Sequence, residues 1–271
     1  MKTIAHISDL HFGTEDPVLA EALAADLQQA PPSLLVVSGD FTQRARRSQF
    51  KAARDFLDRL PHPQLVIPGN HDIPLYDVVR RFSSPLGRYK KFIESNLNPT
   101  YVDDALLVIG LDTTRAYNWK SGGISEEQMR FLADTLGAAG SRFKIVVTHH
   151  PFIPSPVNPN AESELSHAAE ALALLENHEV DLVLAGHLHH GYSGDTRAHF
   201  RSARRSIISV QAGTAISRRV RHQEPNAYNW IQISEGNIRV EVRAWNSRQF
   251  RPLRIAAYKL EVDAWLPVLR E

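Results

Sequence analysis

The chain has 271 residues, and its 31 lysines and arginines nearly balance its 30 aspartates and glutamates, giving a formal net charge of +1. Hydrophobic residues make up 43% and charged residues 23%, a composition that is typical of globular proteins and excludes a disordered chain. The balanced charge argues against a nucleic-acid partner or a membrane-surface protein, and the absence of cysteine excludes disulfides and thiolate metal sites.

The N-terminal sequence MKTIAHISDLHFG does not resemble a signal peptide, because His6, Ser8 and Asp9 interrupt its apolar stretch. The sequence contains no apolar run of the roughly 18 residues that a membrane span requires. We therefore expect a cytoplasmic protein without a membrane span.

Short runs rich in valine, isoleucine and leucine recur along the chain, and each is followed by polar residues. This pattern is typical of strands that are buried on both faces. The runs are TIAHIS before Asp9, LLVVSG before Asp40, QLVIPG before Asn70, KIVVT before His149 and DLVLAG before His187. They predict the parallel strands of a layered fold.

Segments with helical periodicity separate these runs, and the alternation of strand and helix predicts the α/β class. Helices are expected over residues 17–29, 48–60 and 163–177, and from the capping box of Ser125 and Gln128 through Leu136. After about residue 205 the sequence is β-type, with a hairpin turn at Glu235-Gly236-Asn237. We expect this part to form a second sheet that packs on the first, within one domain over residues 1–271.

Metal-ligand residue types stand at the carboxyl end of each predicted strand. They occur in Asp9-x-His11, Gly39-Asp40, Gly69-Asn70-His71-Asp72, His149-His150 and Gly186-His187-x-His189-His190. Because ligands bind outside the carboxyl ends of parallel strands, these distant tips can converge on one site. The two members of Asp9-x-His11 would point the same way on an extended chain, and the glycines would keep the site clear of side chains.

Two divalent metal ions fit this number of donors. Asp40 is the expected bridging ligand, because it is a lone ligand on its tip. Oxygen and nitrogen donors of this kind suit manganese, iron or zinc, and the sequence does not choose among them.

The order D-x-H, G-D, G-N-H-D, H-H-P and G-H-x-H resembles the signature of the calcineurin-like metallophosphoesterases, from Asp9 to His189. The resemblance implies a four-layer α/β/β/α sandwich with a dinuclear site. By motif position, one metal would be held by Asp9, His11, Asp40 and His189, and the other by Asp40, Asn70, His149 and His187.

The same resemblance implies that His71 is a catalytic residue rather than a ligand, and that Asn70, His71 and His189 contact the substrate. A hydroxide bridging the two metals would attack phosphorus. His71 would then pass a proton to the departing alkoxide, because an imidazole exchanges protons near neutral pH.

Residues 106–132, which read LLVIGLDTTRAYNWKSGGISEEQMRFL, resemble a segment of bacterial class III cyclic nucleotide phosphodiesterases, as do SDLHFG and HHPF. A small phosphodiester of the 3′,5′-cAMP type is the substrate that this implies. The alternatives are a glycerophosphodiesterase, a nucleotide-sugar pyrophosphate hydrolase, whose members carry arginine in place of His71, a repair-type nuclease, and an inactive scaffold that binds a partner.

Several side chains near these motifs are open to two interpretations. We expect the arginine-rich stretch 197–221 to be a solvated loop and strand edge, although one or two of its arginines, or Arg44, can contact a substrate phosphate. Tyr117 and Trp119 are expected to cover the core rather than to stack on a base. The C-terminal β segments are a candidate homodimer interface.

Overall fold

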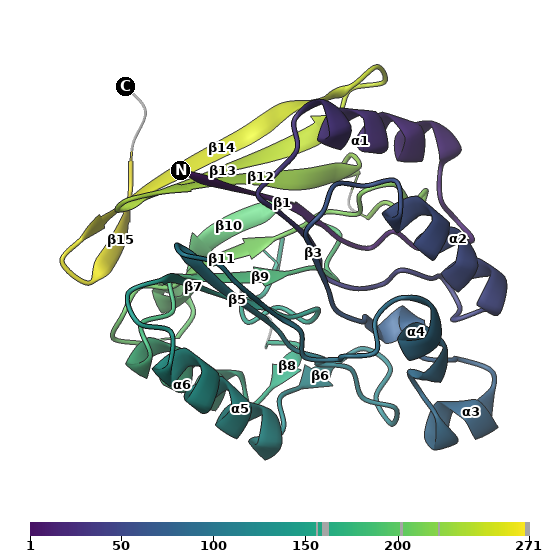
Figure 1. Cartoon of the computed structure of the whole chain (residues 1–271), viewed down its shortest axis with the longest axis horizontal. Helices are drawn as coiled ribbons and strands as arrows, with labels where there is room; N and C mark the ends of the chain where they lie inside the picture. Colours follow the sequence, from purple (N-terminus) through teal and green to yellow (C-terminus); the bar gives the residue numbers. More distant parts are fainter. Residues whose placement is uncertain (156, 159–162, 201–202, 222, 269–271) are drawn as a thin grey trace.

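The computed structural model describes residues 1–155, 157–158, 163–200, 203–221 and 223–268. Two β-sheets lie face to face, and helices cover the outer face of each sheet (Figure 1). The architecture is therefore the four-layer α/β/β/α sandwich that the sequence predicts.

The first sheet has seven strands in the order β15-β14-β13-β12-β1-β2-β3, and β1, β2 and β3 run parallel. Strand β2 is fully buried, as expected for a run without polar residues, and β1 is buried from Ile4 to Ile7. The strands are β1 (Lys2–Ile7), β2 (Leu34–Val37), β3 (Gln64–Val66), β12 (Ala227–Ser234), β13 (Asn237–Trp245), β14 (Phe250–Glu261) and β15 (Ala264–Pro267).

The second sheet has six strands in the order β10-β11-β9-β7-β5-β4, and the inner four are parallel. They are β4 (Thr100–Val102), β5 (Leu106–Gly110), β7 (Phe143–Val147), β9 (Leu182–Ala185), β10 (Tyr192–Asp195) and β11 (Ile208–Gln211). A separate pair, β6 (Gly122–Gly123) and β8 (Leu165–Ser166), lies between helices in the chain.

Three hydrophobic cores separate the four layers. One lies between the sheets, where Val36 and Ile67 meet Val108 and Ile145. The outer cores pack α1, α2 and α4 on the first sheet, and α5 and α6 on the second (Figure 1). The helices are α1 (Pro17–Gln29), α2 (Arg47–Leu57), α3 (Val78–Ser83), α4 (Gly87–Phe92), α5 (Glu126–Gly137) and α6 (Ala168–Asn177), with 3-10 turns η1 (Asn70–Asp72) and η2 (Thr196–Ala198).

Local signals in the sequence place several elements correctly. Helix α1 begins after Asp16, whose side chain accepts hydrogen bonds from the first turn, and α5 begins at the capping box of Ser125. The hairpin between β12 and β13 turns at Gly236, which has a φ of +64°. These expectations are confirmed because each rests on chemistry within a few residues.

Two expectations are wrong. The chain after residue 205 forms no sheet of its own: β12 pairs antiparallel with β1, which places Trp230 opposite Ala5, and β11 joins the second sheet. The helix expected over 163–177 begins only at Ala168, because Leu165 and Ser166 pair with the glycines of β6. Both errors concern strand pairs between distant parts of the chain.

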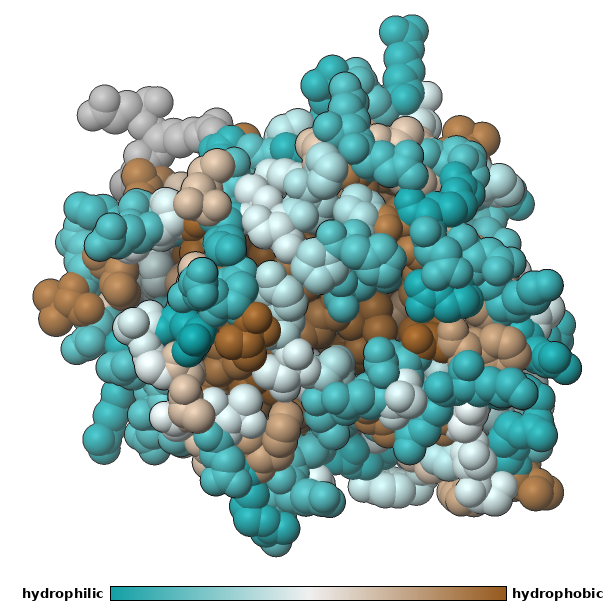
Figure 2. All heavy atoms as spheres, in the orientation of Figure 1, coloured by the Kyte–Doolittle hydropathy of each residue, from teal (hydrophilic) through white to brown (hydrophobic). Residues whose placement is uncertain are grey.

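On the face seen in Figure 2, hydrophilic side chains cover most of the surface, and hydrophobic atoms show mainly in the recesses between them. No helix among the residues that the structure describes combines the length and the apolar character needed to cross a membrane.

Candidate metal centre

The predicted ligands meet at the carboxyl ends of strands from both sheets. Asp9 and His11 follow β1, Asp40 follows β2, Asn70 begins the turn after β3, His149 follows β7, and His187 and His189 follow β9. Four groups of histidines and carboxylates place their donor atoms within 4.8 Å of one another there. The structure thus brings together all the residues that the sequence selected for the site.

The backbone reaches this arrangement through left-handed residues rather than through extended chain. Asp9, His11, Asp40, His187 and His189 have φ values of +53°, +48°, +54°, +71° and +57°. The idea that an extended chain aligns Asp9 with His11 is therefore wrong, although the two side chains do converge. Such non-glycine residues each cost about 1–3 kcal/mol, and they cluster at functional sites.

One cluster contains Asp9, His11 and His189. The Nε2 atom of His189 lies 3.1 Å from Asp9 Oδ1 and 3.2 Å from His11 Nε2. His11 Nε2 is also 3.7 Å from Asp9 Oδ1 and 3.7 Å from Asp40 Oδ2. All four side chains are buried, so few waters can screen them.

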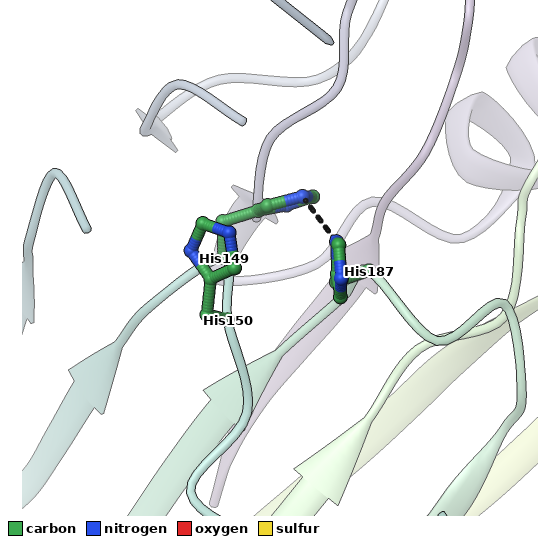
Figure 3. Close-up of side chains that lie close together, drawn as sticks. All are labelled: His149, His150 and His187. Atoms are coloured by element: carbon green, nitrogen blue, oxygen red, sulfur yellow. Dashed lines mark hydrogen bonds between the residues drawn. The ribbon is translucent and has the colours of Figure 1, made fainter. Parts of the chain in front are cut away.

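The second cluster contains Asn70, His149 and His187. Asn70 Oδ1 lies 3.0 Å from His149 Nε2 and 3.0 Å from His187 Nδ1, and these two nitrogens are 3.3 Å apart. Figure 3 shows His149, His150 and His187 together at the ends of adjacent strands, with the contact between His149 and His187 dashed. Asp40 faces this cluster through Oδ1, which is 3.5 Å from His149 Nε2.

Outer hydrogen bonds decide which atom of each side chain faces the second cluster. His149 Nδ1 lies 2.7 Å from the Ser38 carbonyl oxygen, and His187 Nε2 lies 2.5 Å from Glu164 Oε2. These oxygens only accept, so both ring nitrogens must carry the proton. The Asn70 amide donates to the Trp119 carbonyl at 3.1 Å, which turns its oxygen inward.

When both imidazoles are neutral, three lone pairs therefore face one another: Asn70 Oδ1, His149 Nε2 and His187 Nδ1. Such acceptors repel unless a cation lies among them, and an outer hydrogen bond on each imidazole is the usual arrangement for metal-binding histidines. His189 has the same arrangement, because its Nδ1 lies 2.8 Å from the Arg219 carbonyl oxygen. The residues present therefore fit divalent metal ions.

The protonation states also suit metal ions. Burial alone would raise the pKa of Asp9, but the charge of His189 and a hydrogen bond with His11 outweigh it and hold the pKa well below its ordinary value of 3.8. Burial lowers the pKa of His11 to about 4. At neutral pH the carboxylate is thus ionised and this imidazole is neutral, as metal ligands must be.

Close packing behind the ligands requires glycine and a bracing carboxylate. A Cβ atom on Gly39, whose φ is +100°, would lie 2.6 Å from His149 Nδ1. Asp72 accepts hydrogen bonds from the amides of Phe41, Thr42 and Gly69, which ties the second tip to the third. Asp72 therefore braces the two tips, and burial together with the charge of Asp40 raises the pKa of Asp72 to about 7.

His71 stands at the edge of the centre. Its main-chain N–H donates to Asp40 Oδ1 at 2.8 Å, and its ring packs edge-on against His11 with the centroids 4.8 Å apart. Ring atom Nδ1 lies 3.0 Å from the Gln43 carbonyl oxygen, so Nδ1 donates and Nε2 is left to exchange a proton with another group.

A cavity of about 380 Å³ lies beside these residues, and Asp40, Asn70, His71 and His187 line part of it. Five cations and one aromatic residue also line it: Arg44, Arg81, Lys120, Arg219, Arg221 and Trp119. The remaining lining residues are Gln43, Ile73, Leu75 and Glu164. The cavity can therefore receive an anionic group next to the candidate metal centre.

Two expectations about these residues are corrected. Arg219 and Arg221 line the cavity rather than a solvated edge, whereas Arg197 pairs with Asp195 on the surface and Arg201 lies outside the described residues. Tyr117 and Trp119 do not cover the core, since their side chains are 79% and 48% exposed. Sequence reasoning treats a lone aromatic residue as core by default, and nothing local marks these two as exceptions.

Glu164 is the site residue that sequence reasoning missed. It stands within the segment expected to be helical and belongs to no motif. The only general signal is chemical: a metal-binding histidine commonly donates its second N–H to a carboxylate, but sequence alone does not say which one.

Residues 2–191 match the profile of the calcineurin-like phosphoesterases. The chain is 28% identical over 200 residues to a probable cyclic nucleotide phosphodiesterase of Synechococcus. This match covers 70% of the chain and 74% of the relative. It is 29% identical over 164 residues to the glycerophosphodiester phosphodiesterase GpdQ of Enterobacter lignolyticus, and this match covers 56% of the chain and 57% of the relative. In fold it is similar to the solved structure of PhoD, with a TM-score of 0.75 at 10% identity over 100% of this chain and 72% of PhoD.

Proposed function

We propose a substrate and a metal content for this chain, which belongs to the calcineurin-like phosphoesterase family and is a metal-dependent phosphodiester hydrolase. It cleaves cyclic nucleotides of the 3′,5′-cAMP type, and it uses two divalent metal ions to do so. The observation that carries the proposal is the set of lone pairs on Asn70, His149 and His187, which face one another beside an open cationic cavity. The name of the Synechococcus relative supports the choice of substrate.

In this proposal two ions share the ligand Asp40, whose Oδ2 faces His11 and whose Oδ1 faces His149. The first ion is held by Asp9, His11, Asp40 and His189, and the second by Asp40, Asn70, His149 and His187. Bound there, manganese, iron or zinc would polarise the phosphoryl group and lower the pKa of water.

His71 is the proposed catalytic acid. Its contacts with Asp40 and Gln43 hold the ring at the wall of the cavity and leave Nε2 for the substrate. A water molecule that has lost a proton to the solvent adds to phosphorus as hydroxide while the bond from phosphorus to the ester oxygen breaks. That oxygen takes a proton from Nε2 of His71 in its doubly protonated form. Asn70 and His189 complete the proposed contacts with the substrate.

A glycerophosphodiester is the second candidate substrate. The observation in its favour is the 29% identity to GpdQ, which is similar to that of the cyclic nucleotide relative, although it extends over a shorter segment. The two substrate classes differ in what surrounds the diester, so the same metal centre can serve either.

The test begins with protein stripped of metal by a chelator and reloaded with manganese. We expect turnover of bis-p-nitrophenyl phosphate only after reloading, and a higher kcat/KM for 3′,5′-cAMP than for glycerophosphocholine. A preference for glycerophosphocholine would select the second candidate. Absence of any phosphodiester turnover in excess manganese would refute the assignment.

A further inference from the structure

The cavity beside the candidate metal centre has more positive charge than a single phosphodiester requires. Arg44, Arg81, Lys120, Arg219 and Arg221 all line it. Within the part of the chain that the structure describes, none of the five forms an ion pair with a carboxylate. By contrast, Arg218 beside them pairs with Asp16 at 3.6 Å.

Neutral acceptors hold three of these arginines close to the predicted ligands. Arg219 Nη1 donates to Gln43 Oε1 at 3.0 Å, and Arg44 Nη1 donates to the Gln43 carbonyl oxygen at 2.9 Å. Arg221 Nη1 lies 3.5 Å from the His187 carbonyl oxygen. Neutral partners fix the position of a guanidinium group without cancelling its charge, so the charge remains available to an anion.

The cavity wall also holds two carboxylates, those of Asp40 and Glu164. Asp40 is a predicted metal ligand, and Glu164 Oε2 lies 2.5 Å from His187 Nε2. Among the described residues, neither forms an ion pair with the five cations. Bringing like charges together is unfavourable, and an anion of matching charge would relieve the repulsion.

Another part of the wall combines a cation with an aromatic ring. The guanidinium of Arg81 lies 5.4 Å from the ring centroid of Trp119 and is held by the carbonyl oxygens of Pro74 and Asn118. The Trp119 carbonyl accepts the hydrogen bond from Asn70. This wall is thereby anchored to a predicted metal ligand, and its half-exposed ring can stack on a base.

We propose that the substrate is a nucleotide phosphodiester with a second phosphate group, which Arg44, Arg219 and Arg221 bind while the metal centre holds the scissile diester. The inference rests on the proposed phosphodiesterase function, and it predicts that a diester with a second phosphate is a better substrate than 3′,5′-cAMP. A cyclic nucleoside monophosphate has one phosphate and one negative charge, so it would leave most of these cations unmatched. A 5′-phosphorylated dinucleotide and a cyclic dinucleotide both supply the second phosphate.

Two substrate pairs test the proposal in the manganese-loaded protein. The dinucleotide pApA is compared with ApA, which lacks only the terminal phosphate, and cyclic di-AMP is compared with 3′,5′-cAMP. We expect kcat/KM to be about 10–100-fold higher for the member with the second phosphate in at least one pair, the range for charge-assisted contacts to phosphate. The pair that shows the preference identifies the linear or the cyclic source.

Arg219→Gln and Arg221→Gln are expected to reduce this preference about tenfold, whereas Arg218→Gln, on an outward side chain that is 65% exposed, leaves it unchanged. Arg219→Gln keeps the main-chain carbonyl that supports His189. Equal kcat/KM within both substrate pairs, or a preference that survives both cavity substitutions, overturns the inference. Turnover of bis-p-nitrophenyl phosphate, measured in parallel, reports separately on the proposed phosphodiesterase function.

Discussion

The hydrogen bond between Glu164 and His187 gives a sharp test of the metal centre. The carboxylate fixes the proton on His187 Nε2 and so leaves Nδ1 as the donor to metal. Glu164→Gln keeps an acceptor but removes the charge, and Glu164→Ala removes both. Residues that orient metal-binding histidines typically contribute 10–100-fold to metal affinity.

The exposure of Glu164 indicates how much it contributes to metal affinity within this 10–100-fold range. Its side chain is 37% exposed, so water can take over part of its role. We expect Glu164→Gln to weaken manganese binding about tenfold at the site that includes His187, which corresponds to about 1.4 kcal/mol. Glu164→Ala should weaken it further. Isothermal titration of the chelator-treated protein with manganese chloride measures this.

Glu170→Gln is the matched control, since that carboxylate is 67% exposed and its imidazole partner, His167, lies 3.8 Å away on the surface. It should bind manganese like the unaltered protein. If both Glu164 variants also bind manganese with unaltered affinity, Glu164 does not orient His187 and the reasoning is refuted.

Three further predictions concern the acid, the backbone and a surface charge. His71→Ala should retain bound metal yet lose about 10²–10⁴-fold in kcat on a diester with a poor leaving group, and equal rates would exclude the proposed role. Gly39→Ala should lower the free energy of unfolding in urea by about 2–4 kcal/mol, because its Cβ meets His149, whereas Gly236→Ala, with a similar φ sign but open space, should cost about 1 kcal/mol. Burial would raise the pKa of Asp103, but hydrogen bonds from Lys2 and two main-chain amides lower it to about 2. Because this value lies below 3.8, the stabilisation is full above that pH and fades as the pH falls toward 2. Asp103→Asn should therefore cost about 1–2 kcal/mol at pH 7, after allowance for screening, about the same at pH 5, and less in urea titrations at pH 3.5.

The residues of the centre could be chosen from the sequence because each follows a short apolar run. A strand such as β2 is buried on both faces, so the polar residues that follow it, Asp40 among them, lie at the sheet edge where parallel strands end. The fold class follows from the same runs. Agreement of the five motifs with one family order then selects the predicted ligands and leaves out neighbours such as His150, whose ring also lies beside His149 and His187.

What the sequence could not supply depends on contacts between distant segments. Nothing near Trp230 indicates that its strand pairs with β1, some 200 residues earlier, and nothing near Glu164 indicates a partner on the tip of β9. The sequence does not indicate the wall of the cavity either, because Arg219 and Trp119 reach the centre only through tertiary packing. Local sequence patterns predict local structure, and no pattern near these residues indicates their distant partners.

Several costs accumulate at the strand ends. Three features of the site are each unfavourable by themselves. They are the left-handed backbone at Asp9, Asp40 and His187, the lone pairs that face one another, and the buried carboxylates. The surrounding fold imposes them, through glycines without room for a Cβ and through the bonds of Asp72. A cation relieves the last two costs at once, and a ligand present at 100 times its Kd stabilises a folded protein by about 2.7 kcal/mol. The same packing that strains the tips thus prepares them for metal, so stability and metal affinity should change together when a tip is altered.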